Sequence, residues 1–304
     1  MLLLILPLWK MMGEDNSSVY APEEIIGYHE ALVFGLVEGV TEFLPISSTG
    51  HLILTNQWLL DPSSLDSIEQ DAINAYLIVI QAGAILAVAL LYSRRIMAIL
   101  FGFLGLNPEG KRLGINLLSA FVPAALLGPM LDEMIESFLF GIIPVGLALI
   151  GGALLMHWVE KRKQHTDGME GDFGKQLQDL RLREALFVGF LQCVAMWPGT
   201  SRSMMTIVGG YLVGLSRRQA AEFSFLLGLI TLTAAAGYKV LTKGSTLINN
   251  LELGPMLFGC LVAGISAALS VRWLVGYLSK RGLGLFVWYR LFLGFLILFT
   301  YWIF

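Results

Sequence analysis

Residues 38–51 read EGVTEFLPISSTGH and place two glutamates and a histidine inside a strongly apolar stretch of the chain. Glu38 and Glu42 are four residues apart, so on a helix their side chains lie on one face about one turn apart. In hydrocarbon each carboxylate needs a partner or takes up a proton. One interpretation is a structural pair satisfied by a neighbouring helix. We favour a pair that binds a divalent cation or handles protons, because oxygen ligands suit Mg²⁺ and Ca²⁺.

Hydroxyl groups follow Pro45 in the same stretch, at Ser47, Ser48 and Thr49. Serine and threonine are ordinary N-cap residues, so these positions predict the start of a second short helix. The free N–H groups and the dipole of a helix N-terminus also make an anion site. His51 lies three residues after Ser48, within reach of its hydroxyl if the turn is tight. A lone histidine more often packs or lies at an interface, but beside two glutamates and a serine we interpret it as functional.

A second break, PGTSRS at residues 198–203, supplies the positive charge that the first break lacks. Arg202 lies between Ser201 and Ser203, and arginine makes fork-like contacts with phosphate. An arginine at membrane depth is costly unless it meets an anion. Arg202 is also about 15 residues from the basic flank at Arg217, too far along the chain to reach the surface easily. We therefore interpret Arg202 as an anion ligand.

Together the two breaks predict a phosphate-binding centre with an arginine, several hydroxyls, two helix N-termini, two carboxylates and a histidine. Phosphoryl transfer requires mainly charge neutralisation and positioning, which these groups can supply. The apolar surroundings predict that the remainder of the substrate is a lipid. Arg290, in the last apolar segment, stays open between pairing with a glutamate and stabilising the fold.

The composition is that of a polytopic membrane protein. Of the 304 residues 56% are hydrophobic and 14% charged, against about 25% charged in soluble domains, and the mean hydropathy is +0.71. Cys193 and Cys260 both lie in apolar segments, which favours packing over a disulfide or a metal site. A spanning helix needs about 20 apolar residues. Six segments qualify: 73–93, 113–131, 139–158, 220–240, 255–277 and 285–304.

Basic residues predict the orientation of the chain, because they concentrate in cytoplasmic loops. If the six segments alternate, the basic clusters fall on one side, which we assign to the cytoplasm: Arg94, Arg95, Lys111, Arg112, Lys161, Arg162, Lys163, Lys280 and Arg281. The broken region 183–216 has basic residues on both flanks, and the broken region 24–60 has acidic residues on both. We therefore expect two re-entrant hairpins from opposite faces that meet near the midplane, with both termini outside.

An internal repeat supports this arrangement. The segment HEALVFGLVEGVTEFLPISSTG (29–50) matches REALFVGFLQCVAMWPGTSRS (183–203) in its EAL triplet, in a glycine one turn later, and in its Pro and Ser positions with a one-residue shift. Repeats of opposite orientation with broken helices place a binding site at the midplane. We predict an all-α polytopic membrane protein with an inverted-topology repeat, six spanning helices and two re-entrant hairpins. Its parts are an N-terminal extension (1–23) and one membrane domain (24–304), made of repeat one (24–158), a cytoplasmic linker (159–182) and repeat two (183–304).

These motifs resemble those of the undecaprenyl-diphosphatase family, the bacitracin-resistance proteins of bacterial membranes. The family signature EGxTEFLPxSSTGH is matched throughout residues 38–51. The second signature, PGxSRSG followed shortly by Thr, is matched from Pro198 to Thr206, except that Met204 replaces the small glycine. A larger side chain there could narrow the pocket or displace the loop. Similarity also covers QAGAILA (81–87), EFSFLL (222–227) and Tyr289-Arg290, so that it spans essentially 24–304.

The resemblance implies hydrolysis of undecaprenyl diphosphate to undecaprenyl phosphate and phosphate, which recycles the lipid carrier of peptidoglycan synthesis and confers bacitracin resistance. It implies a multi-pass protein of the bacterial cytoplasmic membrane with its site open to the outer face. Ser48 is then the candidate nucleophile, with His51 as its base or as the acid for the leaving group. Glu38 and Glu42 hold a divalent cation, Mg²⁺ or Ca²⁺, or tune His51. The diphosphate ligands are Arg202, Ser201, Ser203 and Thr206, with Ser47 and Thr49 from the first break.

Some alternatives stay open. Direct attack by His51 or by water is compatible with the same residues. A transporter or flippase of phosphorylated prenyl lipid would use the same anion site, and the inverted repeat suits it, but it gives Ser48 beside His51 no chemistry to perform. Membrane lipids are the expected surroundings, a homodimer stays open, and no nucleic-acid partner is expected.

Overall fold

The computed structural model describes residues 26–60, 67–167, 173–249 and 252–303, and these form helices joined by short loops. Apart from one isolated bridge between Lys175 and Leu215, this part of the chain contains no β-structure, which confirms the all-α class. Six helices are long and apolar enough to cross a membrane, so the chain is a multi-pass membrane protein: Ala72–Leu91, Pro108–Asp132, Ile142–His165, Arg217–Leu241, Leu253–Arg281 and Gly284–Trp302. The predicted extension 1–23 lies outside the described residues.

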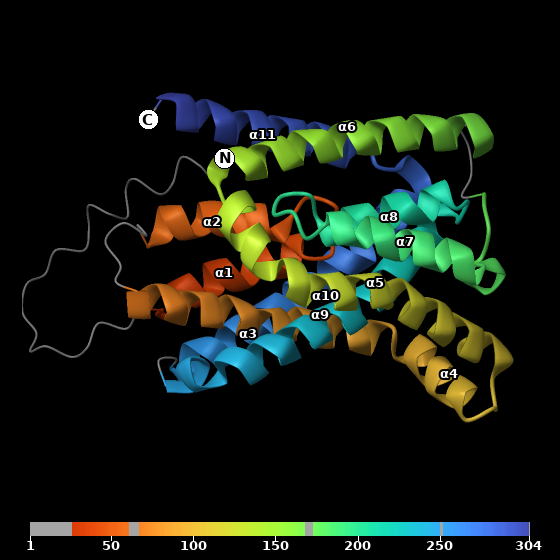
Figure 1. Ribbon diagram of the computed structural model, residues 1–304, viewed down its shortest axis with the longest axis horizontal. Coiled ribbons are helices and arrows are strands. Elements are labelled where there is room, and N and C mark those ends of the chain that lie inside the picture. The colour runs from red at the N-terminus through yellow and green to blue at the C-terminus, as the bar shows by residue number, and fades with distance from the viewer. Residues whose placement is uncertain (1–25, 61–66, 168–172, 250–251, 304) are drawn as a thin grey trace, which may run out of the picture.

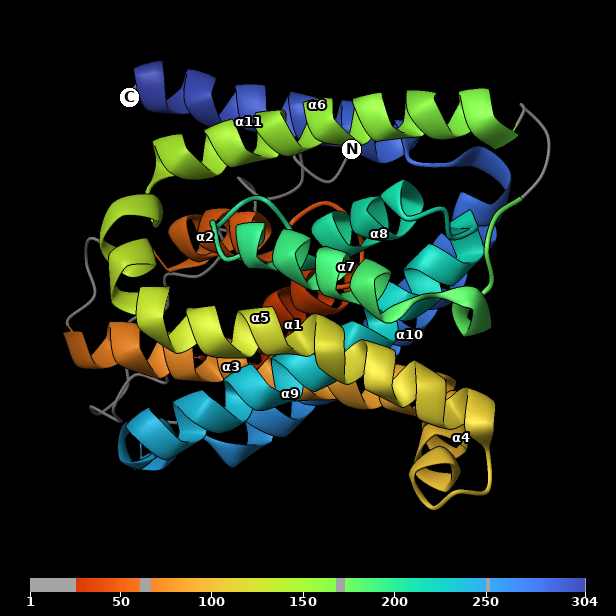
Figure 2. The same cartoon turned by 45° about the vertical axis from the view of Figure 1, so that its right-hand side comes forward.

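Two pairs of short helices take the place of the two broken regions. The first hairpin is α1 (Tyr28–Thr41) and α2 (Ser48–Leu59), and the second is α7 (Leu182–Val194) and α8 (Arg202–Leu212). At 1.5 Å per residue, α1 with its 14 residues is about 21 Å long, short of the roughly 30 Å hydrocarbon core. The hairpins run in from opposite ends of the bundle, and their loops meet in its middle (Figures 1 and 2).

The long helices enclose the hairpins. α6 (Ile142–Asp167) packs beside α11 (Gly284–Ile303) on one side of them. On the other side lie α3 (Ser67–Leu91), α5 (Pro108–Leu139), α9 (Arg217–Asn249) and α10 (Leu253–Arg281), as both views show (Figures 1 and 2). The breaks therefore lie inside protein rather than lipid, which is the condition for irregular backbone at membrane depth.

Each hairpin is held by a helix of the other repeat. α1 packs on α10, and α7 packs on α5. Both contacts are close because a glycine stands at the matching place of each repeat: a Cβ on Gly35 would lie 2.7 Å from the carbonyl oxygen of Gly259, and one on Gly189 would lie 2.3 Å from that of Ala120. Small residues of this kind let helices approach in membranes. The repeat seen in the sequence is therefore a repeat of packing as well.

Two features differ from the expected segments, and both lie at the end of the bundle that carries the basic clusters. A short helix, α4 (Ser93–Phe103), follows α3 where only a connection was expected, and it packs on the start of α5. The predicted linker 159–182 begins within α6, which continues to Asp167, and it includes a short 3₁₀ turn at Leu177–Asp179. Both additions lie where the chain leaves the apolar segments, so apolar length alone did not reveal them.

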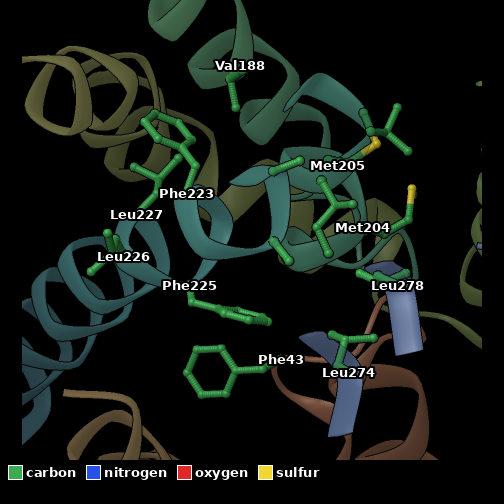
Figure 3. Close-up of a cluster of buried hydrophobic side chains, with 14 of the residues drawn as sticks. Phe43, Val188, Met204, Met205, Phe223, Phe225, Leu226, Leu227, Leu274 and Leu278 are labelled. Atoms are coloured by element: carbon green, nitrogen blue, oxygen red, sulfur yellow. The ribbon is translucent and has the colours of Figure 1, made fainter. Parts of the chain in front are cut away.

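The largest buried cluster surrounds the loops of both hairpins. Figure 3 shows Phe43 of the first break facing Phe225 of α9, with Met204 and Met205 of α8 nearby. The rings of Phe43 and Phe225 pack edge to face, 5.8 Å apart between centroids. This packing fixes the first break against the second repeat.

Candidate active site

The two breaks have the same backbone geometry. Ser47 caps α2 with φ 74°, and Ser201 caps α8 with φ 73°. The hydroxyl of Ser47 accepts from the N–H of Gly50 at 3.3 Å, and the hydroxyl of Ser201 accepts from the N–H of Met204 at 3.3 Å. A positive φ is uncommon for residues other than glycine and costs on the order of 1–3 kcal/mol. Because Ser47 and Ser201 both adopt it, the two breaks share the same strained turn.

Glu42 joins the two hairpins. One of its carboxylate oxygens accepts a hydrogen bond from Nη2 of Arg202 at 2.9 Å, and the other accepts from the hydroxyl of Ser48 at 2.5 Å. The side chains of Glu42 and Arg202 are only 6% and 11% exposed. A charge-assisted contact of this kind is short and strong. The structure thus brings together, from residues 160 positions apart, the carboxylate, the serine and the arginine that the sequence singled out.

Arg202 lies in a narrow space between the first break and α9. Its guanidinium lies 5.3 Å from the ring centre of Phe43, and Nη1 donates to the carbonyl oxygen of Ser224 at 3.2 Å. Its Nε is buried and makes no hydrogen bond. This donor is therefore available to an incoming anion.

Gly228 provides the room for Arg202, which leads to a prediction. A Cβ at Gly228 would lie 2.2 Å from Nη1 of Arg202, whereas one at Gly237, further along the same helix, would meet nothing within 4 Å. We expect Gly228→Ala to displace the guanidinium and lower turnover by about 10- to 100-fold, because one misplaced donor costs this much or more. Gly237→Ala is the matched control and should stay near wild type. Equal activity of the two variants would mean that the position of Arg202 does not matter.

The hydrogen-bond partners of His51 differ from the expected partner, Ser48. Its Nδ1 lies 2.7 Å from the carbonyl oxygen of Ser47, and its Nε2 lies 2.6 Å from the hydroxyl of Tyr289 in α11. Among the described residues no hydrogen bond joins His51 to Ser48, whose hydroxyl is bound to Glu42. The pairing of Ser48 with His51 therefore stays a prediction that would need a rearrangement, and Glu42 is the nearer base.

Glu38 is the least satisfied member of the site. The residue is 1% exposed, and its Oε1 has no hydrogen-bond partner, although the side chain also contacts Gln81. A buried carboxylate oxygen without a partner must carry a proton or bind a cation. Among the described residues no group of three His, Cys, Asp or Glu side chains converges on one point. The cation predicted at Glu38 and Glu42 therefore stays a prediction, and with these two carboxylates it would need water or phosphate oxygens as its remaining ligands, the usual arrangement for Mg²⁺.

The hydroxyls of the second break serve mainly to join elements. Ser203 is hydrogen-bonded to the hydroxyl of Ser201 at 3.0 Å and donates to the carbonyl oxygen of Leu44 at 2.7 Å, which ties one loop to the other. Thr206 lies 2.6 Å from the hydroxyl of Ser224 in α9. Ser203 and Thr206 are fully buried. Their predicted contact with phosphate stays a prediction, and so does that of Thr49 at the half-buried start of α2.

Arg290 is the functional residue that the sequence left unassigned. Its guanidinium is fully buried and donates to four carbonyl oxygens: Pro45 of the first break at 3.4 Å, Gly199 of the second at 2.9 Å, and Ala148 and Leu149 of α6 at 3.1 and 3.3 Å. No carboxylate pairs with it among the described residues. Of the two roles left open for Arg290, the structure shows stabilisation of the fold rather than pairing with a glutamate. Arg290 stabilises the backbone of both loops through Pro45 and Gly199.

Comparison with known proteins assigns the chain to a family. The family model described as bacitracin resistance protein BacA matches residues 31–296. The chain belongs to this family. It is 42% identical to undecaprenyl-diphosphatase 2 of Rhodospirillum rubrum over 90% of this chain and 94% of that protein. It is 42% identical to undecaprenyl-diphosphatase 3 of Acinetobacter baylyi (89% and 97% covered) and 41% identical to the undecaprenyl-diphosphatase of Azotobacter vinelandii (90% and 93% covered).

Met204, which stands where the family signature has a glycine, packs into the buried interior of the protein. The side chain is 1% exposed and belongs to the buried cluster (Figure 3). A Cβ on Gly152 of α6 would lie 2.9 Å from Cε of Met204 and 2.3 Å from Nη2 of Arg290, so the methionine fills space beside Arg290. With the methionine in place, the Ser201 cap has nearly the same φ as the Ser47 cap.

Proposed function

We propose that this chain is an integral membrane phosphatase that hydrolyses undecaprenyl diphosphate to undecaprenyl phosphate and phosphate. The activity is the one named for its relatives. The observation that carries it is the single carboxylate, Glu42, that holds Ser48 of one hairpin and Arg202 of the other. The candidate nucleophile and the candidate phosphate ligand would then act at one point inside an apolar bundle. Hydrolysis would recycle the lipid carrier for peptidoglycan synthesis and so support bacitracin resistance.

The geometry supports a two-step reaction. Ser48 Oγ attacks the terminal phosphorus, an Oγ–P bond forms, the bond from that phosphorus to the bridging oxygen breaks, and undecaprenyl phosphate leaves. The proton of Ser48 passes to Glu42, which already accepts its hydrogen bond. This contact supplies the adjacent base that a serine needs at neutral pH. Water then attacks the phosphoserine, Glu42 returns its proton to Ser48 as phosphate leaves, and the proton of the water passes to His51.

Arg202 and a divalent cation would neutralise the diphosphate. In the resting site Arg202 is bound to Glu42, and an entering diphosphate competes for its guanidinium while the unpaired Nε gains a partner. We infer that Glu38 and Glu42 hold Mg²⁺ or Ca²⁺, because the free Oε1 of Glu38 is a donor of the kind these cations prefer. When bound, the cation would add positive charge beside the transferred phosphoryl group.

The basic end of the bundle would face the cytoplasm. α4, α5, α7 and α9 begin there and α6 and α10 end there (Figures 1 and 2), and these ends carry the basic clusters of the sequence. The positive-inside rule then places the α1–α2 hairpin and both termini on the outer side of the bacterial cytoplasmic membrane. Both hairpins are re-entrant in this arrangement, and the site opens outward. A homodimer also stays a proposal, for which the mass of the detergent-purified protein by light scattering is the test.

Phosphate release by the purified protein tests the function. We expect detergent-solubilised protein to release phosphate from undecaprenyl diphosphate, to lose this activity in EDTA and to regain it with Mg²⁺ or Ca²⁺. Full activity in EDTA would contradict the cation proposal and leave the phosphatase proposal standing. If the protein binds the lipid but releases no phosphate with either cation, the phosphatase proposal fails. A transporter of phosphorylated prenyl lipid would then be favoured, since hairpins from opposite ends also suit alternating access.

A further inference from the structure

Tyr289 is a polar residue at the site to which neither the motifs nor the reaction above gives a role. It lies in α11, far from both breaks in sequence, and is 39% exposed. Its hydroxyl lies 2.6 Å from Nε2 of His51, and the two rings are stacked with an interplanar angle of 6° and 5.6 Å between centroids. Tyrosine in membrane proteins often lies at the lipid interface with its hydroxyl in water. Here the hydroxyl turns inward to the histidine instead.

The two hydrogen bonds of His51 define its tautomer. The carbonyl oxygen of Ser47, 2.7 Å from Nδ1, can only accept. Nδ1 of the neutral ring therefore carries the hydrogen, and Nε2 is left as the acceptor to which Tyr289 donates. A single hydrogen bond would still let the ring turn, whereas a bond at each nitrogen and a parallel ring leave one orientation.

We propose that Tyr289 is a positioning residue that fixes the orientation of the His51 ring, whose tautomer Ser47 sets, so that Nε2 is aimed at the reacting groups. This inference rests on the proposed function, in which His51 takes a proton from the attacking water. Only the lone pair of Nε2 can do this, because Nδ1 is used by Ser47. The substrate or the water replaces the phenol at Nε2 during the reaction, and Tyr289 returns the ring to its resting state.

The place of Tyr289 on α11 supports this role. Adjacent residues of a helix point about 100° apart, so Tyr289 and Arg290 reach different parts of the first break. Arg290 donates to the carbonyl oxygen of Pro45, and Tyr289 holds His51, which in turn bonds the strained Ser47 cap. One rigid helix of the second repeat thus holds the backbone and the histidine of the first.

The test compares Tyr289→Phe with Tyr301→Phe, which removes an exposed phenol from the same helix. We expect Tyr289→Phe to lower kcat about ten-fold with KM within two-fold of wild type, because orientation of a proton-transfer group affects the chemical step. The control should keep both constants. Equal kcat values for the two variants would overturn the proposal.

A second measurement does not depend on activity. In ¹⁵N-histidine NMR of the detergent-solubilised protein, with the His51 signals identified by their loss in His51→Gln, we expect the Nδ1–H tautomer in wild type. In Tyr289→Phe we expect the Nε2 resonance to move toward that of a ring nitrogen that accepts no hydrogen bond from a phenol. An Nε2–H ring in wild type, or an unchanged Nε2 resonance in the variant, would contradict the role of Tyr289. If the Nε2 resonance moves as stated but wild type releases no phosphate, the positioning stands and the proposed function fails.

Discussion

Replacing Arg202 with alanine is expected to reduce phosphate release by about 1,000-fold. Removing one preorganised donor from a transition state lowers the rate about 10²- to 10³-fold. Arg202 offers several donors, and its side chain is only 11% exposed to solvent. Its loss also leaves Glu42 with a buried charge that only Ser48 and a cation can offset. The initial rate with undecaprenyl diphosphate measures the effect.

Two further variants serve as controls for Arg202→Ala. Arg183→Ala removes an exposed positive charge from the start of the same hairpin and should leave the rate unchanged. Arg202→Lys keeps the charge but loses the fork-shaped donor set, so we expect it to recover only part of the activity. Wild-type rates in Arg202→Ala would show that the second hairpin contributes nothing to catalysis.

Replacing Arg290 with methionine should damage both stability and activity. Methionine is an unbranched apolar side chain without donors, so four buried carbonyl oxygens lose their donor, and each unsatisfied group costs on the order of 1–3 kcal/mol. Part of this loss is offset because an arginine charge no longer has to be buried. We expect a lower Tm and a drop in phosphate release of at least about 100-fold, since the loops that carry Ser48 and Arg202 lose their common support.

The two effects of the Arg290 variant can be separated. The free thiols of Cys193 and Cys260 are partly buried, so a thiol-reactive dye can follow thermal unfolding. Activity is then compared at a temperature where the variant is folded. Arg272→Met, on the exposed face of α10, is the control and should match wild type. Full activity of folded Arg290→Met would show that the shared carbonyl contacts are not needed at the site.

Much of the architecture could be predicted from the sequence because the relevant signals are local. The Pro-Ser breaks, their charged flanks and the apolar lengths predicted the hairpins and the six spans. The matching motifs predicted a repeat, which the equal caps at Ser47 and Ser201 and the equal glycine contacts bear out.

The remaining features depend on contacts between distant segments, which no local pattern encodes. Arg290 could be noticed as a charge in an apolar helix, but its carbonyl partners come from three other parts of the chain. His51 was expected to meet Ser48 three residues away, and it meets Tyr289 instead. Met204 replaces a glycine in the signature, and only the packing shows that its side chain lies in the buried cluster, near Gly152 and Arg290.

The most direct test of the account is phosphate release by Ser48→Ala beside wild type, with binding of undecaprenyl diphosphate measured on the same preparations. Ser119→Ala, at a half-buried serine of α5 whose hydroxyl donates to the carbonyl oxygen of Ile115, serves as the control. We predict that Ser48→Ala binds the lipid and releases no phosphate above background, while the control matches wild type. Turnover by Ser48→Ala close to the wild-type rate would contradict it, and would make water or His51 the nucleophile.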